Sequence, residues 1–250
     1  MQSTDYERFR ARLYVNNQYT SEQSSWEELF APVIDKTSVR IFLTVCAMFQ
    51  KHLIHLDVVS AYLYANLPGP AQYITLWGDK KHMVRQLFKV VNGIDNAAQL
   101  WNKQYDKLMI TEGFLRSSRD NCLYIHPETS VQSSLYVDDV LASADVNRKE
   151  ELDKFVKKVQ KEFIVRILGE PKKFLGMEIT YLREQQICCV FQQSYIERLA
   201  QTFLLEPVHA PTTPVKSNAY DKLRLAQQEP DFEGPYRSIV GGLLFIFVCT

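Results

Sequence analysis

The stretch Leu135-Tyr136-Val137-Asp138-Asp139-Val140-Leu141 carries two adjacent carboxylates in the middle of an apolar run that is otherwise typical of a strand. A strand does not ordinarily place two charges there, because an unpaired buried carboxylate is very costly. Two arrangements would accommodate them: a hairpin with the Asp138-Asp139 pair at its solvent-exposed tip, or a metal site that needs both carboxylates. The alternative without a function is an ordinary solvated turn.

A second apolar run, from His55 to Tyr62, contains a single aspartate, Asp57. Mg²⁺ is held in proteins by one or two carboxylates together with water and substrate phosphates. Two such ions can align the attacking and leaving oxygens of a phosphoryl transfer, which needs charge neutralisation more than covalent chemistry. Asp57 and the Asp138-Asp139 pair, on two strands, therefore form a candidate two-metal centre. The alternative for Asp57 is that it caps or turns the chain after its strand.

The composition is that of a globular protein without a charge bias. The chain has 250 residues, of which 46% are hydrophobic and 23% charged, so it can form one large domain or two small ones. Lysine plus arginine and aspartate plus glutamate number 29 each. This balance argues against a dedicated nucleic-acid-binding protein, although charge can be segregated locally. Residues 148–173 hold nine basic and five acidic side chains, and they either contact a phosphate backbone or form a solvated helix face.

The five cysteines show neither a Cys-x-x-Cys motif nor the spacing of a zinc site, which indicates reduced thiols in an intracellular protein. No apolar signal core follows Met1. The apolar segment from Gly241 to Thr250 is ten residues long, whereas a membrane-spanning helix needs about 20. We therefore expect no membrane partner and interpret this segment as a core element cut short, as in a fragment of a longer product.

Hydrophobic spacing predicts helices that alternate with strands. Helices are predicted at 37–51 after a Thr-Ser start, at 97–112, from the capping-box pattern Asn147 to Glu150 onward, and from a second such pattern, Ser194 to Glu197, to Phe203. Strands are predicted at 52–59, 122–125, 134–141, 174–182 and 188–191. Strands that meet as hairpins with helices between them indicate an α+β fold with an antiparallel sheet covered on one face. The lack of a glycine-rich phosphate loop argues against a doubly wound nucleotide-binding fold.

Short motifs spread over nearly the whole chain follow one another in a recognisable order. The two longest are His55 to Leu63 and Tyr136 to Asp139. They are flanked by Phe30 to Val33 with Arg40, Gly113 to Tyr124, Leu168 to Glu170, Phe174 to Ile179, Gln193 to Ile196 and Pro235 to Gly241. Together these motifs resemble the polymerase domain of the reverse transcriptases of Ty1/copia-type retrotransposons, which is part of a Pol polyprotein.

The resemblance implies a right-hand polymerase fold, with an antiparallel sheet and helices in fingers and palm and a partial thumb. Reverse transcriptase fingers and palm are expected within residues 1–215, and a linker or connection segment leading out of the polymerase within 216–250. The fingers are expected at about 1–52 and 65–100, the palm at about 53–64 and 101–182, and a thumb-like part from about 183.

The resemblance also implies an activity and its partners. The activity is RNA-directed DNA synthesis by two-metal, template-directed nucleotidyl transfer, with two Mg²⁺ ions, or Mn²⁺ in their place, as cofactors. The partners are an RNA or DNA template-primer, dNTPs and, if expressed, the rest of a Pol polyprotein with RNase H and integrase. The expected location is intracellular: cytoplasmic within a virus-like particle, or nuclear.

By the same resemblance, Asp57, Asp138 and Asp139 are the catalytic residues and metal ligands. Tyr62 would lie under the incoming sugar and exclude a ribose 2′-hydroxyl; the alternative is a plain core tyrosine. Further substrate-binding residues are expected at Arg40, Lys36, Asn96, Val137 and Arg166. The primer grip is expected at Phe174, Leu175, Gly176 and Met177. The alternatives are a core strand for the primer grip and a solvated helix-end cation for Arg166, while Trp101 either stacks on a base or belongs to the core.

The sequence departs from the family pattern mostly where cations or nucleotide contacts are expected. Asn96 stands for a glutamine, Asn16-Asn17 for Lys-Gly, Asp35 for a basic residue, Val59 for a lysine and Ile167 for an aspartate. Each lost charge-assisted contact weakens nucleotide binding by about 1.5–3 kcal/mol. The interpretation is a polymerase domain, active or degenerate. The alternatives are an inactive element-derived protein that binds nucleic acid or has a structural role and, third, an unrelated two-metal nuclease.

Overall fold

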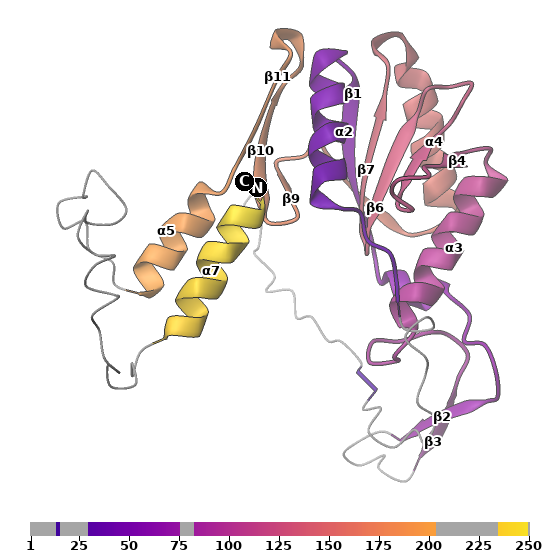
Figure 1. Ribbon diagram of the computed structural model, residues 1–250. Coiled ribbons are helices and arrows are strands. Elements are labelled where there is room, and N and C mark those ends of the chain that lie inside the picture. Colours follow the sequence, from indigo (N-terminus) through magenta and orange to yellow (C-terminus); the bar gives the residue numbers. More distant parts are fainter. Residues whose placement is uncertain (1–13, 16–29, 76–82, 204–234, 250) are drawn as a thin grey trace, which may run out of the picture. The chain divides into compact units, whose positions relative to one another are not determined.

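The computed structural model describes residues 14–15, 30–75, 83–203 and 235–249 (Figure 1). Predictions for the remaining residues, including most of the first fingers segment and the start of the 216–250 segment, lie outside the described residues. The chain divides into two compact units. The first contains the described residues up to 171 together with 181–188, and the second contains 172–180 and 189–249. Each unit is described by itself.

A six-stranded sheet organises the first unit, in the order β4-β5-β6-β7-β1-β8. Its strands are β1 His52–Val58, β4 Leu115–Arg116, β5 Leu123–Ile125, β6 Gln132–Tyr136, β7 Asp139–Ala144 and β8 Val165–Gly169. Every neighbouring pair is antiparallel. The predicted antiparallel α+β fold is therefore confirmed. The predicted strand 134–141 is wrong as a single strand, because the chain reverses after Tyr136 and returns as β7.

The helices of the first unit lie where the apolar spacing predicts them. They are α2 Lys36–Met48, α3 Ala97–Thr111 and α4 Lys149–Glu162. Helix α3 begins at Ala97 as predicted, whereas the starts of α2 and α4 differ from the prediction. The carboxylate of Asp35, rather than a Thr-Ser start, caps α2 by accepting the Thr37 N–H at 2.7 Å. The capping box at Asn147 is wrong, because Val146–Arg148 already form a 3₁₀ turn and Arg148 is the residue before α4, without a side-chain cap bond.

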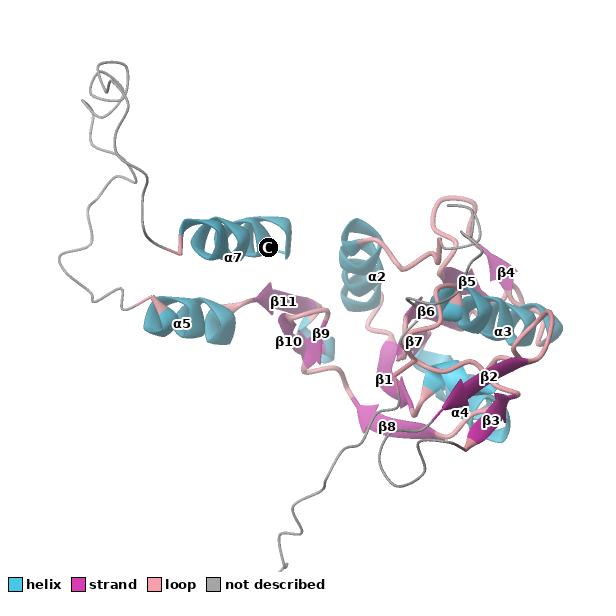
Figure 2. Ribbon diagram, turned by 90° about the horizontal axis from the view of Figure 1, so that it is seen from below, coloured by secondary structure: helices cyan, strands magenta, loops and turns pink. Residues whose placement is uncertain are grey.

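The sheet is covered on both faces at its centre, not on one face as predicted. β7 is buried from Val140 to Ala144, and successive residues of a strand point to opposite faces. On one face, Tyr105 of α3 hydrogen-bonds Ser133 at 2.8 Å. On the other face, Cys46 of α2 lies beside Ser143. Figures 1 and 2 show α2 and α4 on opposite sides of β1 and β7.

An aromatic cluster fills the space under α3. Trp101 lies between Tyr64, Tyr105 and Phe163, with ring centroids 5.0–6.3 Å away. Trp101 is only 1% exposed, so the interpretation of this residue as core rather than as a base-stacking surface is confirmed. The cluster joins α3 to the end of α4, where Phe163 follows the last helical residue. It therefore fixes the position of α3 over the sheet.

Tyr181 ties the end of α2 to the start of β1. Its hydroxyl lies 2.9 Å from the carbonyl oxygen of Cys46 and 2.7 Å from that of Lys51. Elsewhere in the first unit, β2 Gln72–Thr75 and β3 Val84–Leu87 form a small antiparallel hairpin. Sequence reasoning missed this hairpin, as well as β4 and β8.

The second unit contains a small sheet and two helices. Its strands are β9 Lys173–Phe174, β10 Met177–Leu182 and β11 Ile187–Phe191, and its helices are α5 Gln193–Thr202 and α7 Tyr236–Cys249. The sheet order is β11-β10-β9, and the hairpin tip, residues 181–188, groups with the first unit. The capping box at Ser194 is wrong: α5 begins one residue earlier, and the Ser194 N–H donates to Glu178 at 3.0 Å instead.

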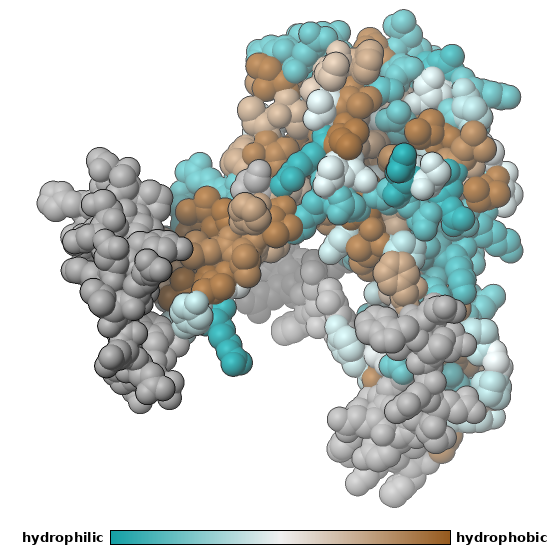
Figure 3. All heavy atoms as spheres, viewed as in Figure 1, coloured by the Kyte–Doolittle hydropathy of each residue, from teal (hydrophilic) through white to brown (hydrophobic). Residues whose placement is uncertain are grey.

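α5 and α7 pack closely because α7 has a glycine at the contact. A Cβ atom on Gly242 would come within 2.5 Å of the Leu199 side chain. The outward side of α7 remains apolar, with exposed Leu243, Leu244 and Phe247, and Figure 3 shows such side chains gathered over this helix. Within the described ranges, no helix combines the length and apolar character that crossing a membrane requires.

A buried lysine anchors the entry to β1. The Lys51 side chain is 7% exposed, and its Nζ lies 2.5 Å from Oδ1 of Asp145, which follows β7 and is 43% exposed. The hydrogen bond from Lys51 is the largest cause that lowers the pKa of Asp145. Because the folded state lowers this pKa, the pair contributes stability above the unfolded pKa of about 3.9 and loses it as the pH falls further.

We predict that Asp145→Asn destabilises the chain more than Lys51→Met. The first change leaves a buried ammonium without its carboxylate, at a cost of about 1–3 kcal/mol, whereas the second leaves an aspartate that water can reach. Urea unfolding at pH 7 measures both. The difference should shrink as the pH falls below about 3.9, because the stability that the pair contributes is lost there. Glu151→Gln, which breaks the exposed pair with Lys154, is the control and should have no measurable effect. Equal losses from the two Lys51–Asp145 variants would contradict the argument.

Candidate functional site

Two of the predicted metal ligands face each other across the central strands. Asp57 of β1 and Asp139 of β7 are direct partners in the antiparallel register. Directly opposite residues have Cβ atoms about 4.5–5.5 Å apart, and like charges at such positions are destabilising. Both side chains reach solvent, with 24% of Asp57 and 34% of Asp139 exposed. The site is therefore a pair of accessible carboxylates that needs positive charge or hydrogen-bond donors nearby.

Each carboxylate has such a group from the same sheet. Arg166 is the partner of Asp57 on β8, and its guanidinium lies 3.4 Å from Oδ2 of Asp57. His55 lies two residues before Asp57, so it shares its strand face. The Nε2 atom of His55 lies 2.7 Å from Oδ1 of Asp139, and the imidazole is 8% exposed. The opposed carboxylates are thus held by a guanidinium on one and an imidazole on the other.

The third carboxylate lies on the turn between β6 and β7. Tyr136 pairs with Asp139, so the tip is Val137-Asp138, not Asp138-Asp139 as the sequence suggests. The hairpin itself, one of the two predicted arrangements, is confirmed. Asp138 is exposed and follows Val137, which has φ +53°. This left-handed conformation is costly for a β-branched residue, by about 1–3 kcal/mol, and persists only where the surroundings impose it.

Two hydrogen bonds from outside the hairpin hold this turn. Trp101 Nε1 of α3 donates to the Val137 carbonyl at 2.5 Å. The Val58 N–H, one residue after Asp57, donates to the Asp138 carbonyl at 2.7 Å. The turn is therefore fixed from α3 on one side and from β1 on the other.

Tyr62 lies close to the turn. It belongs to the 3₁₀ segment Ala61–Tyr64 that follows β1 and is partly buried. Burial is the main cause that raises the pKa of Tyr62, and the negative charge of Asp138 raises it further. The structure thus brings Tyr62, Arg166 and the three carboxylates together in the first unit.

The other predicted substrate-binding residues lie on neighbouring elements. Lys36 and Arg40 are one turn apart on α2, and both are partly exposed. Asn96 immediately precedes α3, where its side chain makes no cap hydrogen bond. Val137 contributes its backbone to the turn described above. Binding roles for all four remain predictions.

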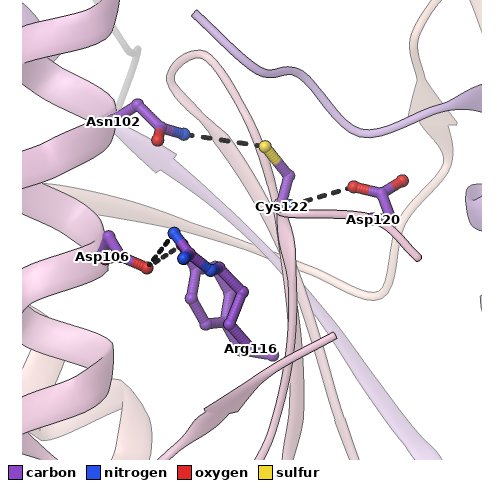
Figure 4. A network of polar contacts seen from close by, with 6 residues as sticks. Asn102, Asp106, Arg116, Asp120 and Cys122 are labelled. Atoms are coloured by element: carbon purple, nitrogen blue, oxygen red, sulfur yellow. Dashed lines mark hydrogen bonds and ion pairs between the residues drawn. The ribbon is translucent and has the colours of Figure 1, made fainter. Parts of the chain in front are cut away.

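A buried aspartate anchors the start of α2. The Asp35 N–H donates to Oδ2 of Asp120 at 2.9 Å. The Cys122 N–H donates to Oδ1 of the same carboxylate, also at 2.9 Å (Figure 4). Burial, followed by the charge of Asp120, raises the pKa of the Cys122 thiol to about 12, so this cysteine is not a nucleophile. Asn102 of α3 donates to its sulfur at 3.6 Å. These contacts link α2, α3 and β5 structurally.

The predicted primer grip forms a tight turn in the second unit. Phe174 and Met177 pair with each other and are buried. Leu175 and Gly176 make the turn, with φ +51° and +78°. A Cβ atom on Gly176 would lie 2.8 Å from the ring of Phe245, so the glycine is required there. The turn backbone, rather than the Phe174 or Met177 side chain, is what this segment presents, and its role remains a prediction.

The carboxylates offer the oxygen ligands that hard divalent cations prefer. Within the part of the chain that the structure describes, no group of three or more His, Cys, Asp and Glu side chains is arranged as a metal site. Oδ2 of Asp57 and Oδ1 of Asp139 instead contact Arg166 and His55. A cation between Asp57 and Asp139 would offset their repulsion, so the donor set fits such an ion once these oxygens turn towards it.

Sequence reasoning missed two residues of the site. The two-residue period of a strand would have placed His55 on the face of Asp57. The contact between Trp101 and Val137 has no signal in the sequence, because it depends on how α3 packs over the sheet.

The chain is similar to known proteins over most of its length. The family model described as "Reverse transcriptase (RNA-dependent DNA polymerase)" matches residues 2–217. The chain is 28% identical to the retrovirus-related Pol polyprotein from transposon TNT 1-94 of Nicotiana tabacum, over 97% of this chain and 19% of that protein. It is also 28% identical to the corresponding polyprotein from transposon RE1 of Arabidopsis thaliana, over 96% and 16%.

A putative transposon Ty5-1 protein of Saccharomyces cerevisiae is 27% identical over 65% of this chain and 52% of its own length. The chain thus spans a fifth or less of the two plant polyproteins. The resemblance drawn from the motifs is confirmed: the chain belongs to the reverse transcriptase (RNA-dependent DNA polymerase) family, as a domain of the Ty1/copia retrotransposon type.

Proposed function

We propose that this chain catalyses RNA-directed DNA synthesis, the template-directed addition of a dNTP to a primer 3′-hydroxyl with release of pyrophosphate. The observation that carries the proposal is the register of β1 and β7, in which Asp57 faces Asp139 while Asp138 lies on the adjoining turn. Two carboxylates on paired strands and a third on the adjoining turn are the protein groups that such a reaction requires.

Reverse transcriptase domains generally use divalent metal ions, and we propose Mg²⁺, with Mn²⁺ as an alternative. Asp57, Asp138 and Asp139 would hold the ions. When bound, such ions neutralise the charge that develops on the transferred phosphate and lower the pKa of the attacking hydroxyl. The protein supplies rigid strands and a hairpin fixed at its turn.

Two further side chains have roles that follow from their positions. Arg166, 3.4 Å from Asp57, is a cation at the place where a triphosphate would approach, and it can exchange the carboxylate for a phosphate oxygen. Tyr62 lies near enough to Asp138 for that carboxylate to raise the pKa of its phenol. A ring there would support a deoxyribose and clash with a 2′-hydroxyl.

The elements also support a division into polymerase subdomains. We propose that the palm consists of the central sheet with α3 and α4, and that the fingers include α2 and the β2–β3 hairpin. The Leu175-Gly176 turn of the second unit would grip the primer, and α5 would belong to a thumb-like part. The partners would be an RNA or DNA template-primer, dNTPs and the remaining domains of a Pol polyprotein such as RNase H and integrase.

We predict that Asp139→Asn lowers primer extension by more than about 100-fold, because a carboxylate that binds metal stabilises the transition state by several kcal/mol. The assay extends a DNA primer on poly-rA with dTTP and Mg²⁺ or Mn²⁺. Asp153→Asn, on the exposed face of α4, is the matched control and should retain activity. Absence of extension by the unmutated chain would refute the enzyme proposal. Salt-sensitive template binding without extension would favour an inactive binding protein, and shortening of the strands without dNTPs would identify a nuclease.

We predict that Tyr62→Val increases ribonucleotide incorporation relative to dNTP by about 10–100-fold, because a pocket that rejects one added group discriminates by about 1–3 kcal/mol. Incorporation of rUTP and dTTP on the same template gives the ratio. Tyr62→Phe keeps the ring and should leave the ratio unchanged. If Tyr62→Val does not alter it, Tyr62 is a core residue and not a sugar gate.

A further inference from the structure

The hairpin that carries two of the carboxylates contains a conformation that it does not stabilise by itself. Val137 is β-branched and has φ +53°, a region that bulky L-residues avoid. Its neighbours Asp138 and Asp139 are also not glycines. Left alone, such a turn would relax, and the peptide groups on both sides of Asp138 would rotate with it. The orientation of the two carboxylates therefore depends on whatever restrains Val137.

Among the described residues, two groups from outside the hairpin donate hydrogen bonds to carbonyl oxygens of the turn, and these bonds differ in kind. The Val58 N–H binds the carbonyl after the strained residue, at Asp138. The Trp101 indole binds the carbonyl of Val137 itself. Peptide rotation at Val137 would break this second bond directly, so Trp101 is the restraint that acts on the strained residue.

Trp101 is suited to this task because its own position is fixed. The side chain is 1% exposed and its ring is packed against Tyr64, Tyr105 and Phe163. An indole has one N–H donor and no acceptor, so a packed indole offers one bond in one direction. The neighbouring core residue Tyr105 directs its hydroxyl to Ser133, away from the turn.

We propose that Trp101 is a positioning residue for the carboxylates: its indole N–H, by binding the Val137 carbonyl, holds the Val137-Asp138 turn in the left-handed conformation that presents Asp138 and Asp139. This role in catalysis rests on the proposed function, whereas the restraint on the turn does not. A tryptophan that only fills the core would contribute volume at this place, and its N–H would be dispensable for the turn.

The test removes the N–H and keeps the ring. Trp101 is replaced, at this position alone in the full chain, by 3-benzothienylalanine, in which sulfur stands in the place of the N–H. Tyr105→Phe is the matched control, because it removes one buried hydrogen bond from the same face of α3 without touching the turn. A third protein combines the analogue with Val137→Gly, since glycine adopts positive φ without strain.

Two readouts separate the restraint from the reaction. The φ angle of Val137 is read from the backbone chemical shifts of the isotope-labelled chain, which needs no activity. The second readout is the Mn²⁺ concentration that gives half-maximal primer extension. We expect the analogue to shift the turn resonances and raise the Mn²⁺ requirement by about 10–100-fold, as outer-shell changes do. Tyr105→Phe should change neither, and Val137→Gly should restore most of the loss.

The proposal is wrong if the analogue leaves the Val137 resonances unchanged, or if Tyr105→Phe shifts them equally. It is also wrong if Val137→Gly fails to restore the Mn²⁺ requirement. If the analogue prevents folding, recovery of folding by Val137→Gly supports the proposal and failure to recover refutes it. If the unmutated chain extends no primer, the chemical shifts still decide the positioning role, and only the proposed function fails.

Discussion

The opposition of Asp57 and Asp139 across β1 and β7 is the constraint on which the site depends. Two carboxylates directly opposite each other destabilise a strand pair, but the register is not free to avoid this. A shift of one residue would turn fully buried side chains such as Leu56 and Val140 to the other face. Burial in the core therefore fixes the register, and the register brings the carboxylates together. Arg166 and His55 then offset the repulsion from positions in the same sheet.

The residues that orient the site belong to the core, so folding and site geometry are coupled. Trp101 fills the space under α3 and also binds the turn. Asp120 is buried and fixes the N-terminal end of α2 through Asp35. A loss of packing around Trp101 would displace the carboxylates, and a loss of packing around Asp120 would displace α2, which carries Lys36 and Arg40. Because core residues orient the carboxylates, the site needs few additional polar side chains to hold them in place.

Much of the fold could be predicted from the sequence, because α2, α3 and α4 each have one strongly apolar face and β1 and β5 are apolar runs. The start of α3 at Ala97 was predicted as well, but the cap of α4 was not, since a pattern such as Asn147 to Glu150 fits a capping box and a 3₁₀ turn equally well. The carboxylates could be identified by their costly setting. The turn could be located only to within one residue, because its position depends on the register in which β6 and β7 pair. The position of His55 beside the carboxylates could have been predicted from the two-residue period of a strand. The contact of Trp101 with the turn could not, because it depends on how α3 packs over the sheet.

One departure from the family pattern has a structural use. Asp35 stands where the resemblance leads one to expect a basic residue, and it caps α2 while its N–H binds Asp120. An acidic residue is favourable at the start of a helix because it complements the helix dipole. With Asp35 in place of a basic residue, the chain has one positive charge fewer near Lys36 and Arg40, but α2, which carries them, is more stable. Preservation of the fold and preservation of phosphate contacts are thus separate properties in this domain. The three carboxylates that we propose as metal ligands are retained, and Arg166, one of the cations beside them, is paired with Asp57.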